Sequence, residues 1–461
     1  MQLNTILLMA EWQVKGLQLF VALSLLIILH EFGHFFFAKL FKTRVEKFYL
    51  FFDFLFPFGN VLPFSLFKKT KGETTYGIGW FPLGGYVKIA GMVDESMDKE
   101  QLAKPAEPWE YRSKKPWQRL FIMLGGIIVN VLVAIIIYSF VMGIWGESYL
   151  PTANAKYGIV ADSTAQTIGF RNGDKIMAVD GRPVENFKEV TRDIIFNGAK
   201  TVSVLRDGQN MDIVIDNTVV GKILKSKKAG FLSPRFPFVI DEVSSKSVAE
   251  KMGFKKGDSI VAFNGEAVTF HDEFISKMKV SPVGSDIKIT VVGEDKQLRD
   301  LVGKLPETKK IGIGPKGYDN YLEFKTIKYS FFPAIARGVT FTGEQFGFYM
   351  AQFKLLFTSK DVKLNENLGG IASFAKIFPS TFDWQEFWML TAFISIILAF
   401  MNLLPIPGLD GGYVIFLLYE IITGRKVNDK VMEIATTVGL VLLLGLMLYA
   451  NGLDIFRAFQ K

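Results

Sequence analysis

The sequence contains no cysteine and only three histidines. Without cysteine the chain can form no disulfide framework and no thiolate metal site. It has no arginine-rich arm and no nucleic-acid-binding motif, and its formal net charge of +8 is modest and spread along the chain. We therefore expect no nucleic-acid partner and interpret the positive charge as loops beside anionic lipid.

Long apolar runs are abundant instead. Hydrophobic residues make up 49% of the chain, and phenylalanine alone occupies 44 positions. A spanning helix needs about 20 mostly apolar residues, and four stretches are long enough: 17–38, 120–144, 387–404 and 431–448. The first is too long for a cleaved signal peptide and has no small-residue cleavage site. The sequence therefore predicts a polytopic α-helical membrane protein with four transmembrane helices.

A fifth apolar run, residues 48–67, is rich in aromatic side chains. It contains Asp53, Pro57 and Pro63, and prolines interrupt a spanning helix. We expect this run to be an interfacial or re-entrant segment.

The first predicted span carries a metal-binding motif, His30-Glu31-Phe32-Gly33-His34. His-Glu-x-x-His is the helical zinc motif of metallohydrolases. On an α-helix the two histidines lie one turn apart on the same face, so both imidazoles can reach one metal ion. Glu31 lies beside them, where its carboxylate can accept a proton from water activated at the metal. Ionisable groups inside a membrane span are costly, which favours a functional role for all three.

Lysine and arginine near the span ends predict the orientation. They gather after the first span, before the second span, and between the third and fourth spans: Lys39, Lys42, Arg44, Lys47, Arg112, Lys114, Lys115, Arg119, Arg425, Lys426 and Lys430. We therefore expect residues 39–118 and 405–430 on the cytoplasmic side. Both termini and the long middle region are expected on the outer side, and the motif near the cytoplasmic end of its span.

The middle region contains two copies of one pattern. Residues 169–176 (GFRNGDKI) are echoed by residues 253–260 (GFKKGDSI), 84 positions later. Each copy alternates short β-like runs, such as 175–179 and 201–205, with one or two helices. The pattern resembles PDZ domains of the bacterial protease type, which implies two tandem PDZ-like α/β domains at 148–225 and 226–315. Such domains accept an extended peptide at a sheet edge, so peptide or protein ligands are expected. The alternative is a pair of inert spacers that limit access by bulk.

A catalytic zinc site requires a third protein ligand, and the candidate is Asp410. It lies in residues 402–412 (NLLPIPGLDGG), where the prolines end the third span and force irregular backbone that is tolerated when it lines a cavity. Gly411 and Gly412 allow close approach to another backbone. His271 lies in the second repeat and is not expected to be a ligand. The alternative role for Asp410 is to cap a helix that begins near Gly411.

With the motif, residues 402–412 and the paired repeat signatures, the chain resembles the site-2 proteases, a family of intramembrane zinc metalloproteases. The resemblance is strongest to the bacterial regulator-of-sigma-E type with two PDZ domains. It implies Zn²⁺ held by His30, His34 and Asp410, with Glu31 as general base and Asn402 binding the substrate backbone or the developing oxyanion. It also implies a bacterial cytoplasmic (inner) membrane location.

The same resemblance implies a membrane-associated β-hairpin at about 74–92 that presents an edge strand to the substrate. The expected substrate-binding glycines of this hairpin are Gly77, Gly79, Gly84 and Gly85. Expected substrates are single-span membrane proteins trimmed beforehand by another protease, such as anti-sigma factors or remnant signal peptides.

The expected organisation is an N-terminal membrane half (1–147), the PDZ-like pair, and a C-terminal membrane half (316–461) that begins with an amphipathic segment. Two other functions compete with proteolysis. A catalytically silent membrane PDZ scaffold would usually lose the glutamate or a ligand of the motif, and all are present. A zinc transporter would need several polar sites along a path, whereas the sequence shows one compact group.

Overall fold

The computed structural model describes residues 11–55, 61–82, 84–92, 105–216, 220, 222–223, 230–358 and 369–459. Several predicted segments lie partly outside the described residues: 56–60 of the aromatic run, Leu83 of the hairpin, 93–104 of the cytoplasmic segment, and 224–229, which contain the predicted boundary between the two PDZ-like domains. The chain forms two compact units. The first contains the described residues up to Gly146, Lys328–Leu356 and those after residue 368, and the second contains Glu147–Ile327.

The first unit contains helices long and apolar enough to cross a membrane in all four predicted regions. They are α2 (Glu11–Leu40), α4 (Pro116–Ile144), α13 (Trp384–Leu403) and α15 (Asp429–Phe459). All four begin a few residues earlier than predicted, and α15 continues well past the predicted end at residue 448. Hydropathy located the apolar centre of each helix, whereas polar end residues continue the helices beyond it.

Three further helices occur among the described residues of this unit. Helix α10 (Phe331–Thr358) occupies the region predicted as an amphipathic segment, and α12 (Ile371–Ala375) is a single short turn. Helix α14 (Asp410–Thr423) lies inside the region predicted as a cytoplasmic loop. Short 3-10 turns include Tyr111–Ser113 before α4.

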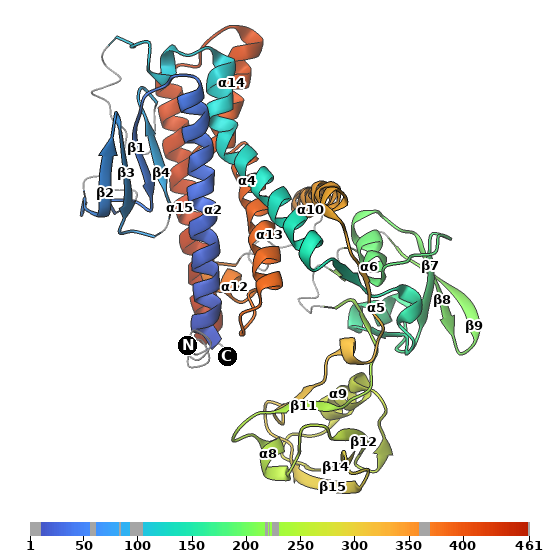
Figure 1. Ribbon diagram of the computed structural model, residues 1–461. Helices are drawn as coiled ribbons and strands as arrows, with labels where there is room; N and C mark the ends of the chain where they lie inside the picture. Colours follow the sequence, from blue (N-terminus) through green and yellow to red (C-terminus); the bar gives the residue numbers. More distant parts are fainter. Residues whose placement is uncertain are drawn as a thin grey trace. The chain divides into compact units, whose positions relative to one another are not determined.

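Helix α4 packs against α2, α13 and α14 (Figure 1), so it is the common partner of α2 and α14, the two helices that carry the candidate ligands. At Gly33 of α2 and Gly125 of α4 the two backbones meet directly. A Cβ placed on Gly125 would lie 2.5 Å from the Gly33 carbonyl oxygen, closer than any real contact. Small residues permit this approach between membrane helices, and here they place α4 directly behind the His-Glu-x-x-His motif.

A four-stranded sheet packs against α2 and replaces the predicted hairpin. Its strands are β1 (Val45–Leu50), β2 (Ser65–Lys71), β3 (Thr74–Gly79) and β4 (Tyr86–Ile89), in the order β2-β3-β1-β4. The predicted hairpin at 74–92 was wrong, because β3 and β4 do not pair with each other. Strand β1 lies between them, parallel to β3 and antiparallel to β4. The hairpin in this sheet is β2–β3. The aromatic run contributes to strands β1 and β2, and its interfacial placement stays a prediction.

The second unit contains two separate hydrophobic cores, one for each copy of the sequence repeat. The first half contains β6 (Ile159–Ala161), α5 (Ser163–Ile168), β7 (Lys175–Val179), α6 (Phe187–Phe196), β8 (Thr201–Arg206), β9 (Gln209–Val214) and β10 (Leu232–Pro234). The second half contains β11 (Ile240–Val243), α8 (Val248–Met252), β12 (Ser259–Phe263), β13 (Glu266–Ala267), α9 (His271–Val280), β14 (Asp286–Val292), β15 (Leu298–Lys304) and β16 (Ile313–Pro315). Strands β5 (Glu147–Tyr149) and β17 (Lys325–Ile327) pair where the chain enters and leaves the unit.

The repeated residues have the same structural roles in both halves. Gly169 ends α5 and Gly253 ends α8, each in the left-handed conformation that favours glycine. The carboxylates of Asp174 and Asp258 are almost fully buried. Each accepts a hydrogen bond of 2.8 Å from the backbone N–H three residues earlier. The Gly-x-x-x-Gly-Asp pattern therefore encodes a helix end followed by a turn that leads into the first core strand.

Strand pairing shifts the division between the two halves. Strand β10 pairs with β6, and Phe231 and Leu232 belong to the first hydrophobic core. The first half therefore extends beyond the predicted boundary at residue 225. The turn signature marks the middle of each repeat, but a closing strand far from the signature leaves no comparable pattern.

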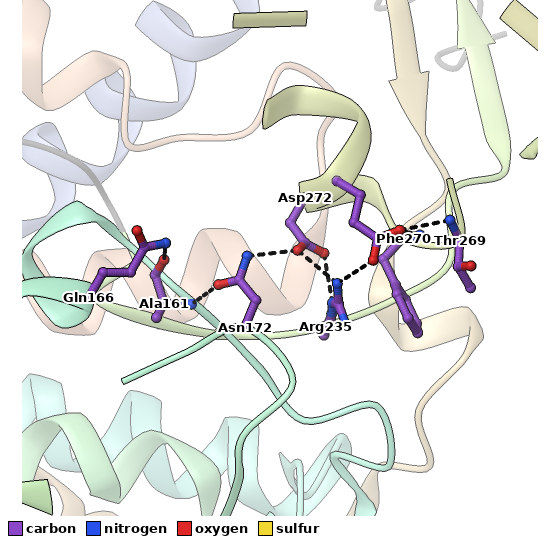
Figure 2. A network of polar contacts seen from close by, with 8 residues as sticks. Ala161, Gln166, Asn172, Arg235, Thr269, Phe270 and Asp272 are labelled. Carbon is purple, nitrogen blue, oxygen red and sulfur yellow. Dashed lines mark hydrogen bonds and ion pairs between the residues drawn. The ribbon is translucent and has the colours of Figure 1, made fainter. Parts of the chain in front are cut away.

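A polar network joins the two halves of this unit (Figure 2). Arg235 donates to both carboxylate oxygens of Asp272, at 3.0 and 3.1 Å, and its guanidinium lies 3.9 Å from the centre of the Phe270 ring. Asn172 of the first half donates to Asp272 at 2.8 Å and accepts from the Ala161 N–H. Because Asp272 is buried and its partners Arg235 and Asn172 are partly buried, we expect the network to restrain the two halves against each other.

Candidate metal centre

Three side chains from two helices converge in the first unit. His30 and His34 come from successive turns of α2, and Asp410 is the first residue of α14. The Nε2 atoms of the two histidines are 3.3 Å apart, and they lie 3.3 and 3.4 Å from Asp410 Oδ2. These side chains are only 11–15% exposed. Among the described residues, no other group of three such side chains could hold a metal ion.

The spacing of these three atoms fits a tetrahedral zinc ion. With zinc–ligand distances of about 2.0–2.2 Å, neighbouring ligand atoms of a tetrahedron lie about 3.4 Å apart. The three observed separations equal this value to within 0.1 Å. The donor set of two imidazoles and one carboxylate is also one that zinc accepts in catalytic sites, with a fourth position left open.

The hydrogen bonds of His34 determine which of its nitrogens can bind the metal. Its Nδ1 lies 2.8 Å from the carbonyl oxygen of Ile122 in α4. A carbonyl can only accept, so Nδ1 carries the proton and donates. The lone pair of the neutral ring is therefore on Nε2, the atom that faces His30 and Asp410.

Asp410 does not cap the helix that it begins. The residue at the cap position is Leu409, and no side chain caps the first turn. Asp410 Oδ2 is buried without a hydrogen-bond partner in the described part of the chain. A buried carboxylate oxygen without such a bond is costly, and a bound cation would satisfy it.

The glycines after Asp410 fix the start of α14. A Cβ on Gly411 would lie 2.5 Å from the Leu403 carbonyl oxygen, and one on Gly412 would lie 2.6 Å from that of Ile406. The helix therefore begins tightly folded against the Pro-x-Pro turn, as expected from the sequence. This packing holds Asp410 directly after the Pro-x-Pro turn, at the first residue of α14.

A cavity of about 550 Å³ adjoins the three side chains. Glu31, Asn402, Gly84 and Gly85 all line it, together with residues of α4, α15 and β4. Glu31 makes no hydrogen bond or ion pair with any described residue. Gly85 lies so near that its Cβ would be 3.2 Å from Glu31 Cγ.

Two of the predicted substrate-binding glycines lie elsewhere. Gly77 and Gly79 are in β3, where added Cβ atoms would lie 2.8 Å from the Phe67 carbonyl oxygen and 2.6 Å from the Asp53 nitrogen. They allow the strands to pack closely and are not among the residues that line the cavity. Strand β3 lies inside the sheet, whereas β4 is an edge strand, and substrate binding by Gly77 and Gly79 stays a prediction.

The contribution of α4 was not anticipated from the sequence. Asn130 is fully buried, lines the cavity and lies 3.2 Å from His30 Nδ1 through its side-chain Nδ2. Arg119 forms a buried ion pair of 2.5 Å with Glu420 of α14. A lone asparagine inside an otherwise apolar span was a signal that could have identified Asn130, because polar groups there need partners.

Comparisons with known proteins identify the family. The model of peptidase family M50 matches residues 18–446. The chain belongs to peptidase family M50. It is 30% identical to protease RseP of Yersinia pestis and to regulator of sigma-E protease RseP of Escherichia coli, and each alignment covers 96% of this chain and 97% of the relative. A putative zinc metalloprotease of Vibrio cholerae is 28% identical over the same shares of both chains.

Membership of family M50 decides the class of the enzyme. The protein is a membrane metalloprotease of the site-2 type. The relatives align along nearly the whole chain, so both units take part in the resemblance. His30, His34 and Asp410 form the group that could hold the metal ion of such an enzyme.

Proposed function

We propose that this M50 peptidase uses Zn²⁺ at His30, His34 and Asp410 to cleave transmembrane segments of single-span membrane proteins. The observation that carries the proposal is the agreement between the three separations of 3.3–3.4 Å and the edge of a zinc tetrahedron. Zinc bound there would supply a Lewis acid and lower the pKa of water at the open position.

The chain's own residues supply the acid–base chemistry and the orientation. Glu31 accepts the proton of the attacking water and later delivers it to the leaving amine. Asn402, in the last turn of α13, lines the same cavity. Its amide NH₂ would hold the substrate backbone or the developing oxyanion, a contribution of about 3 kcal/mol when well aimed.

The cavity suits an extended peptide. It runs along α2 from Leu23 to His34, which is about 16 Å at 1.5 Å per residue. That length accommodates about five residues in extended conformation. A substrate helix hides its carbonyls in internal hydrogen bonds, so it must unwind before attack. Strand β4 lines the cavity and is the edge of its sheet, and it can replace the lost hydrogen bonds.

The edge-strand role is tested by proline substitution within β4. Neighbouring residues of a strand direct their N–H groups to opposite sides, so of Val87→Pro and Lys88→Pro one removes a donor at the free edge. We expect that variant to lower cleavage while the protein remains folded. Unchanged cleavage in both folded variants would exclude β4 as the substrate-binding strand.

We further propose that the second unit consists of two PDZ-like domains on the outer side of the bacterial inner membrane. The matching roles of Asp174 and Asp258 support two copies of one domain. The lysine and arginine distribution supports an outer location for this unit and for both termini, with residues 39–118 on the cytoplasmic side. The pair would then exclude untrimmed proteins by size or bind a newly exposed carboxyl end.

The test of the function uses the full-length protein with a reporter membrane helix, analysed by mass spectrometry. We expect cleavage within the helix, its loss on chelation, and its recovery on adding zinc. Glu31→Gln separates the competing functions, because a protease should keep its metal and lose activity by about 10²–10⁴-fold. A variant that still cleaved at the wild-type rate would exclude Glu31 as the base. Complete absence of cleavage by the wild type, with zinc bound, would favour a silent scaffold.

A further inference from the structure

One face of α4 contacts the candidate metal centre although this helix carries no ligand. Ile122, Gly126 and Asn130 recur at a spacing of four residues, so they lie on the same side of the helix. Ile122 contacts His34 through its carbonyl oxygen, and Gly126 leaves the space filled by the His30 ring. Asn130 is the remaining polar contact on this face.

The Asn130 side chain is fully buried, and its Nδ2 lies 3.2 Å from His30 Nδ1. Its Oδ1 is buried and has no hydrogen-bond partner within the described residues. The backbone carbonyl of Asn130 accepts a hydrogen bond of 2.8 Å from Ser395 in α13. The Asn130 side chain therefore lies beside His30, but its acceptor atom Oδ1 accepts no hydrogen bond from any described residue.

The chemistry of a neutral imidazole decides which amide atom should face His30. The His30 Nε2 atom points toward His34 and Asp410, so a metal ion there requires the lone pair on Nε2. The single ring proton is then on Nδ1, which becomes a donor. A donor needs an acceptor opposite it, and the amide NH₂ cannot accept. Turning the amide by about 180° exchanges its nitrogen and oxygen and supplies that acceptor.

We propose that Asn130 is the positioning residue of His30, with its side-chain Oδ1 accepting the His30 Nδ1–H in the metal-loaded enzyme. This inference rests on the proposed function. The arrangement parallels the bond from His34 to the Ile122 carbonyl, so each ligating imidazole is oriented by α4. Such partners fix the tautomer and the ring, and their loss typically costs about 10–100-fold in metal affinity.

The experiment measures zinc affinity of the full-length protein by competition with a chelator, independently of proteolysis. Asn130→Leu removes the acceptor at similar volume, and we expect affinity to fall by about 10–100-fold. Asn130→Asp retains an acceptor oxygen, and we expect it to bind at least about ten times more tightly than the leucine variant. Thr391→Val is the matched control, because Thr391 is buried and bonds only within α13. We expect it to bind zinc as the wild type does.

The outcomes separate this inference from the function on which it rests. Wild type without stoichiometric zinc would overturn both. Wild-type affinity in Asn130→Leu, with zinc bound normally in the wild type, would overturn the inference alone. Equal losses in the leucine and aspartate variants would overturn the assignment of an acceptor role. If Asn130→Leu fails to fold, Asn130→Ala removes the same acceptor without adding bulk, and the same criteria apply.

Discussion

The contact between Gly126 and His30 predicts that one methyl group can strongly weaken metal binding without unfolding the protein. A Cβ on Gly126 would lie 2.6 Å from His30 Nδ1 and 2.7 Å from its Nε2. Its closest ring atom would be His30 Cε1. Ordinary contacts of this kind are roughly 3.5 Å, so the ring must move by about 1 Å. Alanine at position 126 therefore displaces a ligand whose distance to the metal tolerates a change of only about 0.2 Å.

The expected result for Gly126→Ala is a fall in zinc affinity of at least about 100-fold, the upper end of what loss of an outer partner costs. That factor corresponds to about 2.8 kcal/mol. The fold should survive, because the colliding atoms belong to the end of a side chain. Alanine also favours the helix over glycine by about 0.5–1 kcal/mol.

The matched control is Gly143→Ala in the same helix. There the atom nearest to an added Cβ is the Cβ of Ala334, at an ordinary contact distance of 3.5 Å. Both variants gain helix propensity, so both should unfold at or above the wild-type temperature, while only Gly126→Ala should lose zinc in the chelator competition. Equal zinc affinity in the two variants would contradict the prediction, since it would mean that the His30 ring does not occupy the ligating position.

Three further predictions concern the second unit. Arg206→Ala leaves Asp174 buried without its cation, and we expect a loss of about 3–5 kcal/mol of unfolding free energy; Arg192→Ala, which breaks an exposed helix pair, should cost at most about 0.5 kcal/mol in the same denaturation assay. Arg235→Ala removes the cation of the network that joins the two halves, and we expect proteolytic cleavage between them to accelerate; an unchanged rate would show that other contacts join them. Burial lowers the pKa of His271 below its ordinary value of 6.5, against the opposing effect of a neighbouring carboxylate. The stability that neutral His271 contributes is therefore complete above pH 6.5 and decreases as the pH falls toward the lowered pKa. The unfolding free energy of His271→Phe should depend less on pH between about 7.5 and 5.5 than that of the wild type. An identical pH dependence in the two proteins would contradict this prediction.

The residues that the sequence identified are those whose signals are local. The His-Glu-x-x-His spacing is set by one helical turn, so His30 and His34 could be paired from the motif alone. Asp410 could be added because a carboxylate beside a Pro-x-Pro turn at the end of a span needs a partner. The repeat was visible because two turns of the same kind recur at a fixed spacing.

The sheet could not be derived in the same way, because strand pairing is not local. Residues 74–92 contain two strands separated by glycines, a pattern typical of a hairpin. Their true partner is Val45–Leu50, a strand that overlaps the aromatic run predicted to be an interfacial segment. Alternation within a strand says which face is buried but does not identify the neighbouring strand.

The contacts made by α4 were hidden for a different reason. The carbonyl of Ile122 orients His34, and every residue has a carbonyl, so no side-chain pattern marks it. The pairing of Arg119 with Glu420 joins positions 301 residues apart. Such contacts follow from helix packing and can be recognised only after the helices are placed.

X-ray absorption at the zinc edge of the purified full-length protein tests the central claim most directly. We expect one zinc ion per chain, coordinated by two imidazoles and oxygen at about 2.0–2.2 Å, and loss of one oxygen ligand with weaker binding in Asp410→Ala. Absence of stoichiometric zinc, or an unchanged spectrum and affinity in Asp410→Ala, would contradict it.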